Sequence, residues 1–241
     1  MEAIEAFVYI FLIWLAFGFS KWLAERKEKK SKTAVSEAEE NAYLELLERD
    51  RIIGDFVLTG AALPAKSNPI TPIEGYRFEW ETSEIARVIA SISAEKLYGV
   101  LQAMIDIFGS TLSVSIMDFH TDERQTIDYI GYNKDAYQIK YLIEQYKSFI
   151  INNGELMLSL FSTEKKLEIR LTQTKQVIAF ADEIDPVLDV LHDFEIWSKP
   201  DLRFFSESNY YYYNDFAQTN ILFRLVEQLQ AHLLGEPLVA T

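Results

Sequence analysis

The sequence predicts an α+β fold: a mostly antiparallel sheet with helices on one side, preceded by one N-terminal transmembrane helix. Three observations support this prediction. Residues 155–182 hold three alternating apolar runs separated by polar turns, the pattern of an antiparallel meander. Amphipathic helical patterns lie on both sides of that region. Residues 6–20 carry no charge.

The N-terminal segment, residues 1–32, is predicted to be a membrane anchor with a basic flank. Its apolar residues surround the whole helical wheel, which a surface helix of a soluble domain would not show. At about 1.5 Å per residue, residues 6–24 reach roughly 28 Å, close to the thickness of a hydrocarbon core. The residues expected at the membrane interface are Lys21, Trp22, Arg26 and Lys27.

Two other interpretations of this segment stay open, a cleaved signal peptide and a helix packed in the domain or against a partner. A signal peptide is disfavoured because Glu2 and Glu5 precede the apolar run and no small-residue cleavage site follows it. The basic flank predicts a single-pass membrane protein with the N-terminus outside and residues 25–241 in the cytoplasm.

Three further regions are predicted after the anchor. Residues 33–58 form an acidic amphipathic helix or stalk, with Ser36 and Glu39 at capping-box spacing and a helical pattern to about Ile53. Residues 59–75 are rich in Pro and Gly and form the best linker candidate. Residues 76–241 form the α+β globular domain.

The first half of this domain is predicted to mix strands and helices. Residues 76–81 alternate like a half-buried strand, and two helices follow, the second over 94–108 with Ser93 as its cap. Residues 110–119 form a strand that residues 126–132 can pair with. Asp135 caps a helix that ends at 152–154.

The second half contains the meander and shorter elements. Asp185 and Pro186 supply the N-cap and first position of a helix that reaches about Phe194. Two short strands are predicted within 202–208 and 210–214, and an amphipathic helix over 216–234.

Composition excludes several functional classes. The chain has no cysteine, which removes disulfides, thiolate metal sites and cysteine nucleophiles. The net charge is −14, and residues 1–32 hold six Lys/Arg against four Asp/Glu, so the excess of acid lies in the rest of the chain. That sign argues against nucleic-acid binding and favours a basic protein partner, with simple solubility as the alternative explanation.

One cluster has a catalytic appearance. Asp118, His120 and Asp122 follow an apolar strand, and a D-x-H at a strand end resembles one metal-binding corner of the metallophosphatases. The G-D-x-x-D and G-N-H motifs that this family also needs are missing, so a polar hairpin turn is the favoured interpretation and no metal or cofactor is predicted. The chain also lacks G-x-S-x-G, G-x-G-x-x-G and the P-loop motif.

An aromatic run is the candidate partner-binding site. Tyrosine combines apolar area with a polar tip and is enriched at binding surfaces. The residues proposed to contact a partner are Tyr210, Tyr211, Tyr212, Tyr213 and Trp197. Filling of an edge strand is the simpler explanation of the tyrosines.

These observations predict a membrane-tethered, non-enzymatic interaction protein whose acidic cytoplasmic domain binds a basic protein partner. An inhibitor or immunity-like protein and an accessory subunit of a membrane complex both fit this charge. The alternative is a membrane-anchored, metal-dependent hydrolase that uses Asp118, His120 and Asp122. The sequence indicates no oligomeric state.

Overall fold

The computed structural model of the chain describes residues 52–53, 55–64, 70–82, 85–119, 126–207, 209–212 and 219–234. All of them lie in the second of the two compact units into which the chain divides, Leu47–Thr241. The anchor, its interface residues Lys21, Trp22, Arg26 and Lys27, and most of the predicted stalk lie outside the described residues.

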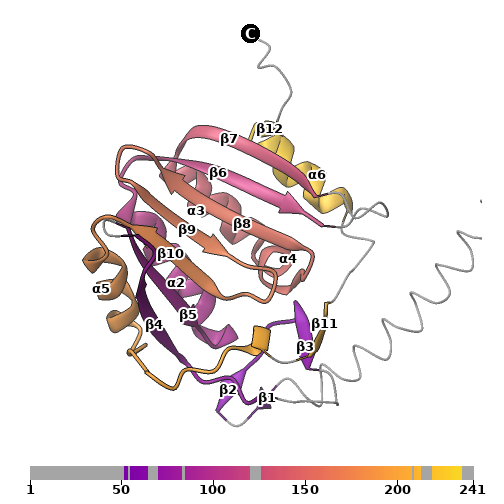
Figure 1. Ribbon diagram of the computed structural model, residues 1–241. Helices are drawn as coiled ribbons and strands as arrows, with labels where there is room; N and C mark the ends of the chain where they lie inside the picture. Colours follow the sequence, from indigo (N-terminus) through magenta and orange to yellow (C-terminus); the bar gives the residue numbers. More distant parts are fainter. Residues whose placement is uncertain are drawn as a thin grey trace, which may run out of the picture. The chain divides into compact units, whose positions relative to one another are not determined.

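Within the described residues, eight strands form one sheet in which every neighbouring pair is antiparallel (Figure 1). The order across the sheet is β12 (His232–Leu233), β7 (Ile127–Asp135), β6 (Thr111–Asp118), β8 (Leu156–Ser162), β9 (Leu167–Leu171), β10 (Val177–Ala181), β5 (Ala86–Ser91) and β4 (Gly75–Trp80). The mixed architecture and the antiparallel sheet are therefore confirmed.

The sheet has one buried face because its strands alternate. In β9 and β10 every second residue is buried, as at Ile169 and Ala179, while the residues between them are partly exposed. In β8 the leucines at alternate positions, such as Leu160, are buried on the same face. Helices cover this face and lie behind the sheet in Figure 1. They are α2 (Ala94–Ile107), α3 (Ala136–Gln145), α4 (Lys147–Asn152), α5 (Asp185–Asp193) and α6 (Thr219–Gln228).

The prediction of a helix before residue 94 is wrong, because residues 86–91 form strand β5. Ala86, Val88 and Ala90 are buried on the helix-covered face, and Arg87 and Ile89 point to the other face. This period of two suits a strand, and β5 pairs with β10 on one side and with β4 on the other. The predicted strand 76–81 and helix 94–108 are confirmed by β4 and α2.

Other elements differ from the predictions in their bounds. The helix capped by Asp135, whose carboxylate accepts a 2.9 Å hydrogen bond from the Gln138 N–H, is interrupted at Tyr146 and continues as α4. The predicted strand in 202–208 is wrong, because Phe205–Glu207 is a 3₁₀ turn. The C-terminal helix ends at Gln228, and Gln230 adopts a φ of +48° before β12 begins.

The segment before β4 packs against one end of the domain. Here β1 (Ile52–Ile53) pairs with β2 (Phe56–Val57), so the predicted helix does not reach Ile53. Strand β3 (Ala62–Pro64), within the predicted linker, pairs with β11 (Tyr210–Tyr212). A Cβ at Gly154 would lie 2.0 Å from the Ala61 carbonyl oxygen, so this approach requires glycine.

A search of the described residues finds no helix that is long and apolar enough to cross a membrane. The span predicted over residues 6–24 lies outside the residues searched, so the anchor stays a prediction.

We expect Leu160→Ala to lower the free energy of unfolding by about 2 to 5 kcal/mol, since it opens a cavity in the middle of the core. Urea unfolding of the full chain, followed by tryptophan fluorescence, measures the change. Tyr137→Ala is the control because this α3 side chain is 81% exposed, and it should change stability by about 0.5 kcal/mol or less. Equal losses in both variants would contradict the one-sided core.

Candidate partner-binding surface

Helix α5 carries a row of exposed carboxylates. Pro186 in its first turn fits the helix start, and Val187 and Leu191 bury its inner face in the core. Asp185, Asp189 and Asp193, spaced four residues apart, are exposed on the outer side and are called the acidic row below. In the described part of the chain, no Lys or Arg forms an ion pair with the acidic row.

Three aromatic rings attach the end of α5 to the outermost strand. The Tyr76 hydroxyl in β4 lies 3.0 Å from His192 Nε2. The His192 ring in turn stacks on the indole of Trp197, with centroids 4.7 Å apart and planes at 22°. Trp197 is still 54% exposed, and burial raises the pKa of the Tyr76 hydroxyl. The sequence analysis named Trp197 as a partner-contact residue, which stays a prediction, and did not foresee its position beside α5.

The contact at His192 fixes which face of α5 is turned to β4. Asp185 lies seven residues before His192, which is two helical turns, so the two side chains share one face. Strand register gives the position along the strand: Ala181, four residues before α5, pairs with Ala86, and Ala86 pairs with Trp80. The start of α5 therefore lies at the Trp80 end of β4, and its end lies at Tyr76.

Two further aromatic side chains of β4 remain exposed on this side of the sheet. Phe78 and Trp80 alternate with Tyr76 and so project to the helix-covered side, beyond the edge of that cover. Phe78 is 36% exposed and Trp80 is 63% exposed, and their rings meet edge to face with centroids 5.3 Å apart. These two residues and the exposed side chains of Asp185, Asp189 and Trp197, which lie on the same side of the sheet, are called the β4–α5 edge below.

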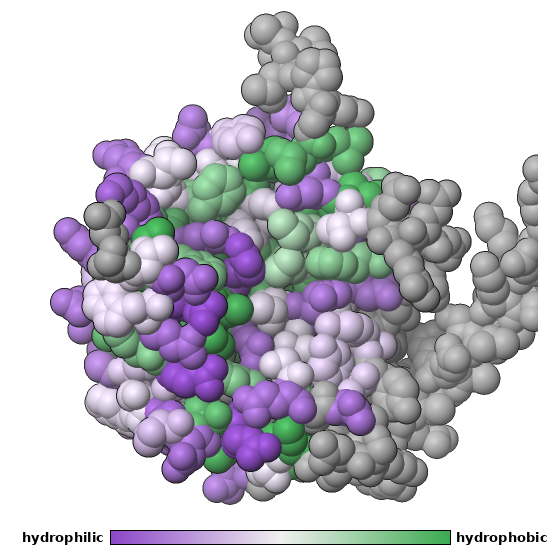
Figure 2. All heavy atoms as spheres, viewed as in Figure 1, coloured by the Kyte–Doolittle hydropathy of each residue, from purple (hydrophilic) through white to green (hydrophobic). Residues whose placement is uncertain are grey.

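The opposite face of the sheet has a different charge arrangement. Arg77 pairs with Glu79 at 2.6 Å, Arg87 pairs with Glu81 at 2.7 Å, and Arg87 also contacts Glu79. The hydrogen bond from Arg87 holds the pKa of Glu79 below its usual range. Hydrophilic and hydrophobic residues are interspersed over this face (Figure 2). Arg77 and Arg87 on this face thus have carboxylate partners, whereas no described Lys or Arg pairs with the acidic row.

The predicted tyrosine site lies elsewhere in the domain. Tyr210 is half-buried, and its ring contacts Phe205 at 5.5 Å and Tyr212 at 5.0 Å, not Trp197. The Tyr212 hydroxyl donates to Gln173 Oε1 at 3.3 Å, and burial raises the pKa of Tyr212. The side chain of Tyr211 and all of Tyr213 lie outside the described residues.

The metal-site hypothesis receives no support from the described part of the chain. Asp118 ends β6 and is buried, whereas His120 and Asp122 lie outside the described residues. Where the chain is described, no three His, Cys, Asp or Glu side chains are grouped so that they could hold a metal ion. The hypothesis itself is therefore untested.

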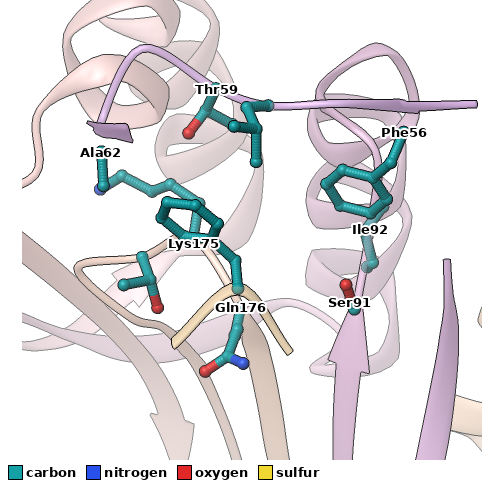
Figure 3. A pocket seen from close by; sticks show the side chains of 10 residues that line it. Phe56, Thr59, Ala62, Ser91, Ile92, Lys175 and Gln176 are labelled. Atoms are coloured by element: carbon teal, nitrogen blue, oxygen red, sulfur yellow. The ribbon is translucent and has the colours of Figure 1, made fainter. Parts of the chain in front are cut away.

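A small pocket lies between the sheet and the segment that precedes β4 (Figure 3). Phe56 and Phe205 line it, with Ser91 and Thr59 among its polar groups. Lys175, in the turn between β9 and β10, runs along one side and extends towards Ala62. Sequence reasoning missed this residue, since a lysine in a polar turn is normally exposed.

Lys175 is a buried cation without a carboxylate partner in the described structure. Its side chain donates one hydrogen bond, from Nζ to the Leu156 carbonyl oxygen at 3.0 Å, and the residue is 3% exposed. Burial lowers the pKa of the ammonium from its ordinary 10.5 to about 7. The Lys175 side chain lines the pocket, and its Nζ is held at the Leu156 carbonyl.

No protein-family model, no curated protein and no solved structure matches this chain. The arrangement of its own residues therefore carries the functional argument.

We expect Lys175→Met to raise the free energy of unfolding at pH 7 and to have little effect near pH 11. The unfolded lysine takes up its proton near pH 10.5 and the folded one near pH 7, so the wild-type chain loses stability as the pH falls between these values. At about 1.4 kcal/mol per pKa unit, the wild-type chain loses about 4 kcal/mol of stability at pH 7. The gain in Lys175→Met is this amount minus the contribution of the hydrogen bond to Leu156, which the variant lacks.

Urea unfolding at pH 7 and pH 11 measures this difference. Lys165→Met is the matched control, because Lys165 also donates to a carbonyl, that of Ile107 at 2.7 Å, but is exposed. Its effect should be small and independent of pH. A Lys175→Met chain that is less stable than wild type at pH 7 would show that the ammonium is not destabilising there.

Proposed function

We propose that this chain is a non-enzymatic interaction protein whose acidic domain binds a basic protein partner at the β4–α5 edge. The observation that carries the proposal is the acidic row, unpaired within the described part of the chain, beside the exposed rings of Trp80 and Trp197. A hydrolase at Asp118, His120 and Asp122 has no comparable observation in its favour.

The chemistry of this surface suits a Lys- or Arg-rich partner. Like charges four residues apart on a helix repel each other, so the acidic row costs stability unless a cation approaches. Exposed indole rings bind cations over their faces, and Arg also stacks on them. Tryptophan and arginine are the residue types that dominate binding energy at protein interfaces.

The proposal includes a membrane tether. Residues 6–24 would span the bilayer, with Lys21, Trp22, Arg26 and Lys27 at the cytoplasmic interface. A basic flank is attracted to anionic lipid, whereas an acidic domain is repelled by it. This opposition would keep the domain off the headgroups and its binding surface accessible to a soluble or membrane-bound partner.

We expect the triple variant Asp185→Asn, Asp189→Asn and Asp193→Asn to weaken binding of a Lys/Arg-rich peptide by about tenfold, because exposed charge pairs contribute about 0.2–1 kcal/mol each. Isothermal titration calorimetry of the full chain in detergent at 50 mM and 200 mM salt measures the affinity. Wild-type binding should weaken as salt rises, and the variant should respond less.

The control removes the same net charge from another part of the surface. Glu144→Gln, Glu164→Gln and Glu227→Gln change three exposed carboxylates outside α5. Their affinity should stay within about twofold of wild type, because none of the three belongs to the acidic row and general attraction between separated charges weakens at 200 mM salt. Equal weakening by both triple variants would show general charge attraction and no defined site.

The tether predicts a topology that protease treatment can test. In intact cells, the domain should resist externally added protease and be digested only after the cytoplasmic membrane is permeabilised. Ile10→Lys with Trp14→Lys should release the chain to the soluble fraction, since each charge costs about 2.5–3.5 kcal/mol in the membrane centre. Digestion in intact cells would place the domain outside.

A further inference from the structure

The outermost strand of the sheet has backbone hydrogen-bonding groups that no described residue bonds. β4 pairs with β5 on one side and is the last strand of the sheet on the other. In an antiparallel pair, alternate residues point their N–H and C=O groups away from the partner strand. Tyr76 is one of them, because its N–H and C=O bond to residues outside the sheet, so Phe78 and Trp80 point outward as well.

Part of this edge is already occupied by the chain itself. The Tyr76 N–H donates to the Trp197 carbonyl at 3.1 Å, and the Lys199 N–H donates to the Tyr76 carbonyl at 3.0 Å, which makes a short parallel bridge. Pro200 follows directly. Beyond Tyr76, no described residue bonds to the outward groups of Phe78 and Trp80.

The remaining edge is short and is bordered by aromatic rings. An added strand would lie against Phe78 and Trp80 and would meet Trp197 at one end. Exposed edges of this kind accept extended peptides, with the main chain supplying affinity and alternate side chains supplying specificity. An edge with Lys side chains or a bulge would discourage such pairing, and β4 has neither on its outward-facing residues.

The negative charge of the acidic row favours a basic segment as the added strand. Every second side chain of an added strand would face the same side as Phe78, Trp80 and the acidic row. Arg or Lys at those positions can lie over the Trp80 ring and reach Asp185 and Asp189. A second copy of this domain would bring its own acidic row to the same place and be repelled.

From this arrangement we infer that the β4–α5 edge binds an extended segment of a partner protein as an additional strand, with Arg or Lys at every second position. The inference rests on the proposed function and adds the mode of binding. The backbone of Phe78 and Trp80 pairs with the segment. Asp185 and Asp189 form ion pairs with its Arg or Lys side chains.

The test uses the full chain and two peptides. The first alternates valine and arginine over seven residues. The second has the same sequence with every amide N-methylated, so it keeps the charge and loses the donors that a strand needs. We expect the second to bind at least tenfold more weakly in calorimetry at 100 mM salt.

Three variants separate the contributions. Trp80→Lys puts a repelling charge on an exposed position of the edge and should weaken the first peptide at least tenfold. Asp185→Asn with Asp189→Asn should weaken both peptides about fivefold. Glu164→Gln is the control, and its affinity should stay within twofold of wild type. Circular dichroism confirms that each variant keeps its fold.

The outcomes distinguish this inference from the broader proposal. If both peptides bind equally and the aspartate variant weakens both, the acidic surface binds basic segments but strand addition is wrong. If neither peptide binds, both proposals are wrong. If the wild-type chain is a dimer in sedimentation and Trp80→Lys is a monomer, a second copy occupies the edge and the inference is overturned.

Discussion

Burial of one sheet face against helices is the constraint on which the described structure depends. Every second residue of the central strands enters the same core, and the apolar faces of the helices enter it from the other side. A shift of one residue in any strand would turn its buried side chains outward, so the pattern also fixes the register. Burial of roughly 25 cal/mol per Å² of apolar surface makes this the main stabilising term.

The same constraint creates the surface where binding is proposed. An open sheet has two edges, and helix cover that ends before the edge leaves the last strand's core-side residues exposed. Tyr76 still reaches His192 under α5, whereas Phe78 and Trp80 extend past the cover. The other face of β4 carries paired charges. Its exposed aromatic side chains are a risk for aggregation unless another protein covers them. A partner that binds there removes this risk.

Sequence periodicity predicted the meander β8–β10 and helix α2, because each has a long enough apolar pattern to choose between periods of 3.6 and 2. It failed for β5, where apolar Ile89 on the open face breaks the alternation and alanine, a strong helix former, occupies two of the buried positions. Trp197 was chosen for its residue type alone. Its contact with His192 and the approach of His192 to Tyr76, 116 positions away, depend on tertiary packing that no local pattern contains. The acidic row can be seen in the sequence as aspartates at i, i+4 spacing. The sequence does not show that no described Lys or Arg pairs with them.

Charge placement separates structural from binding residues in this domain. The arginines of the open sheet face are held between carboxylates, and Lys175 is buried at a carbonyl, where desolvation lowers its pKa to about 7. Neither group is available to neutralise the acidic row on α5. Net charge alone makes a protein soluble without making a site. The binding site is inferred from this local imbalance beside exposed indole rings and backbone groups that no described residue bonds. A basic strand is the simplest ligand that satisfies all three.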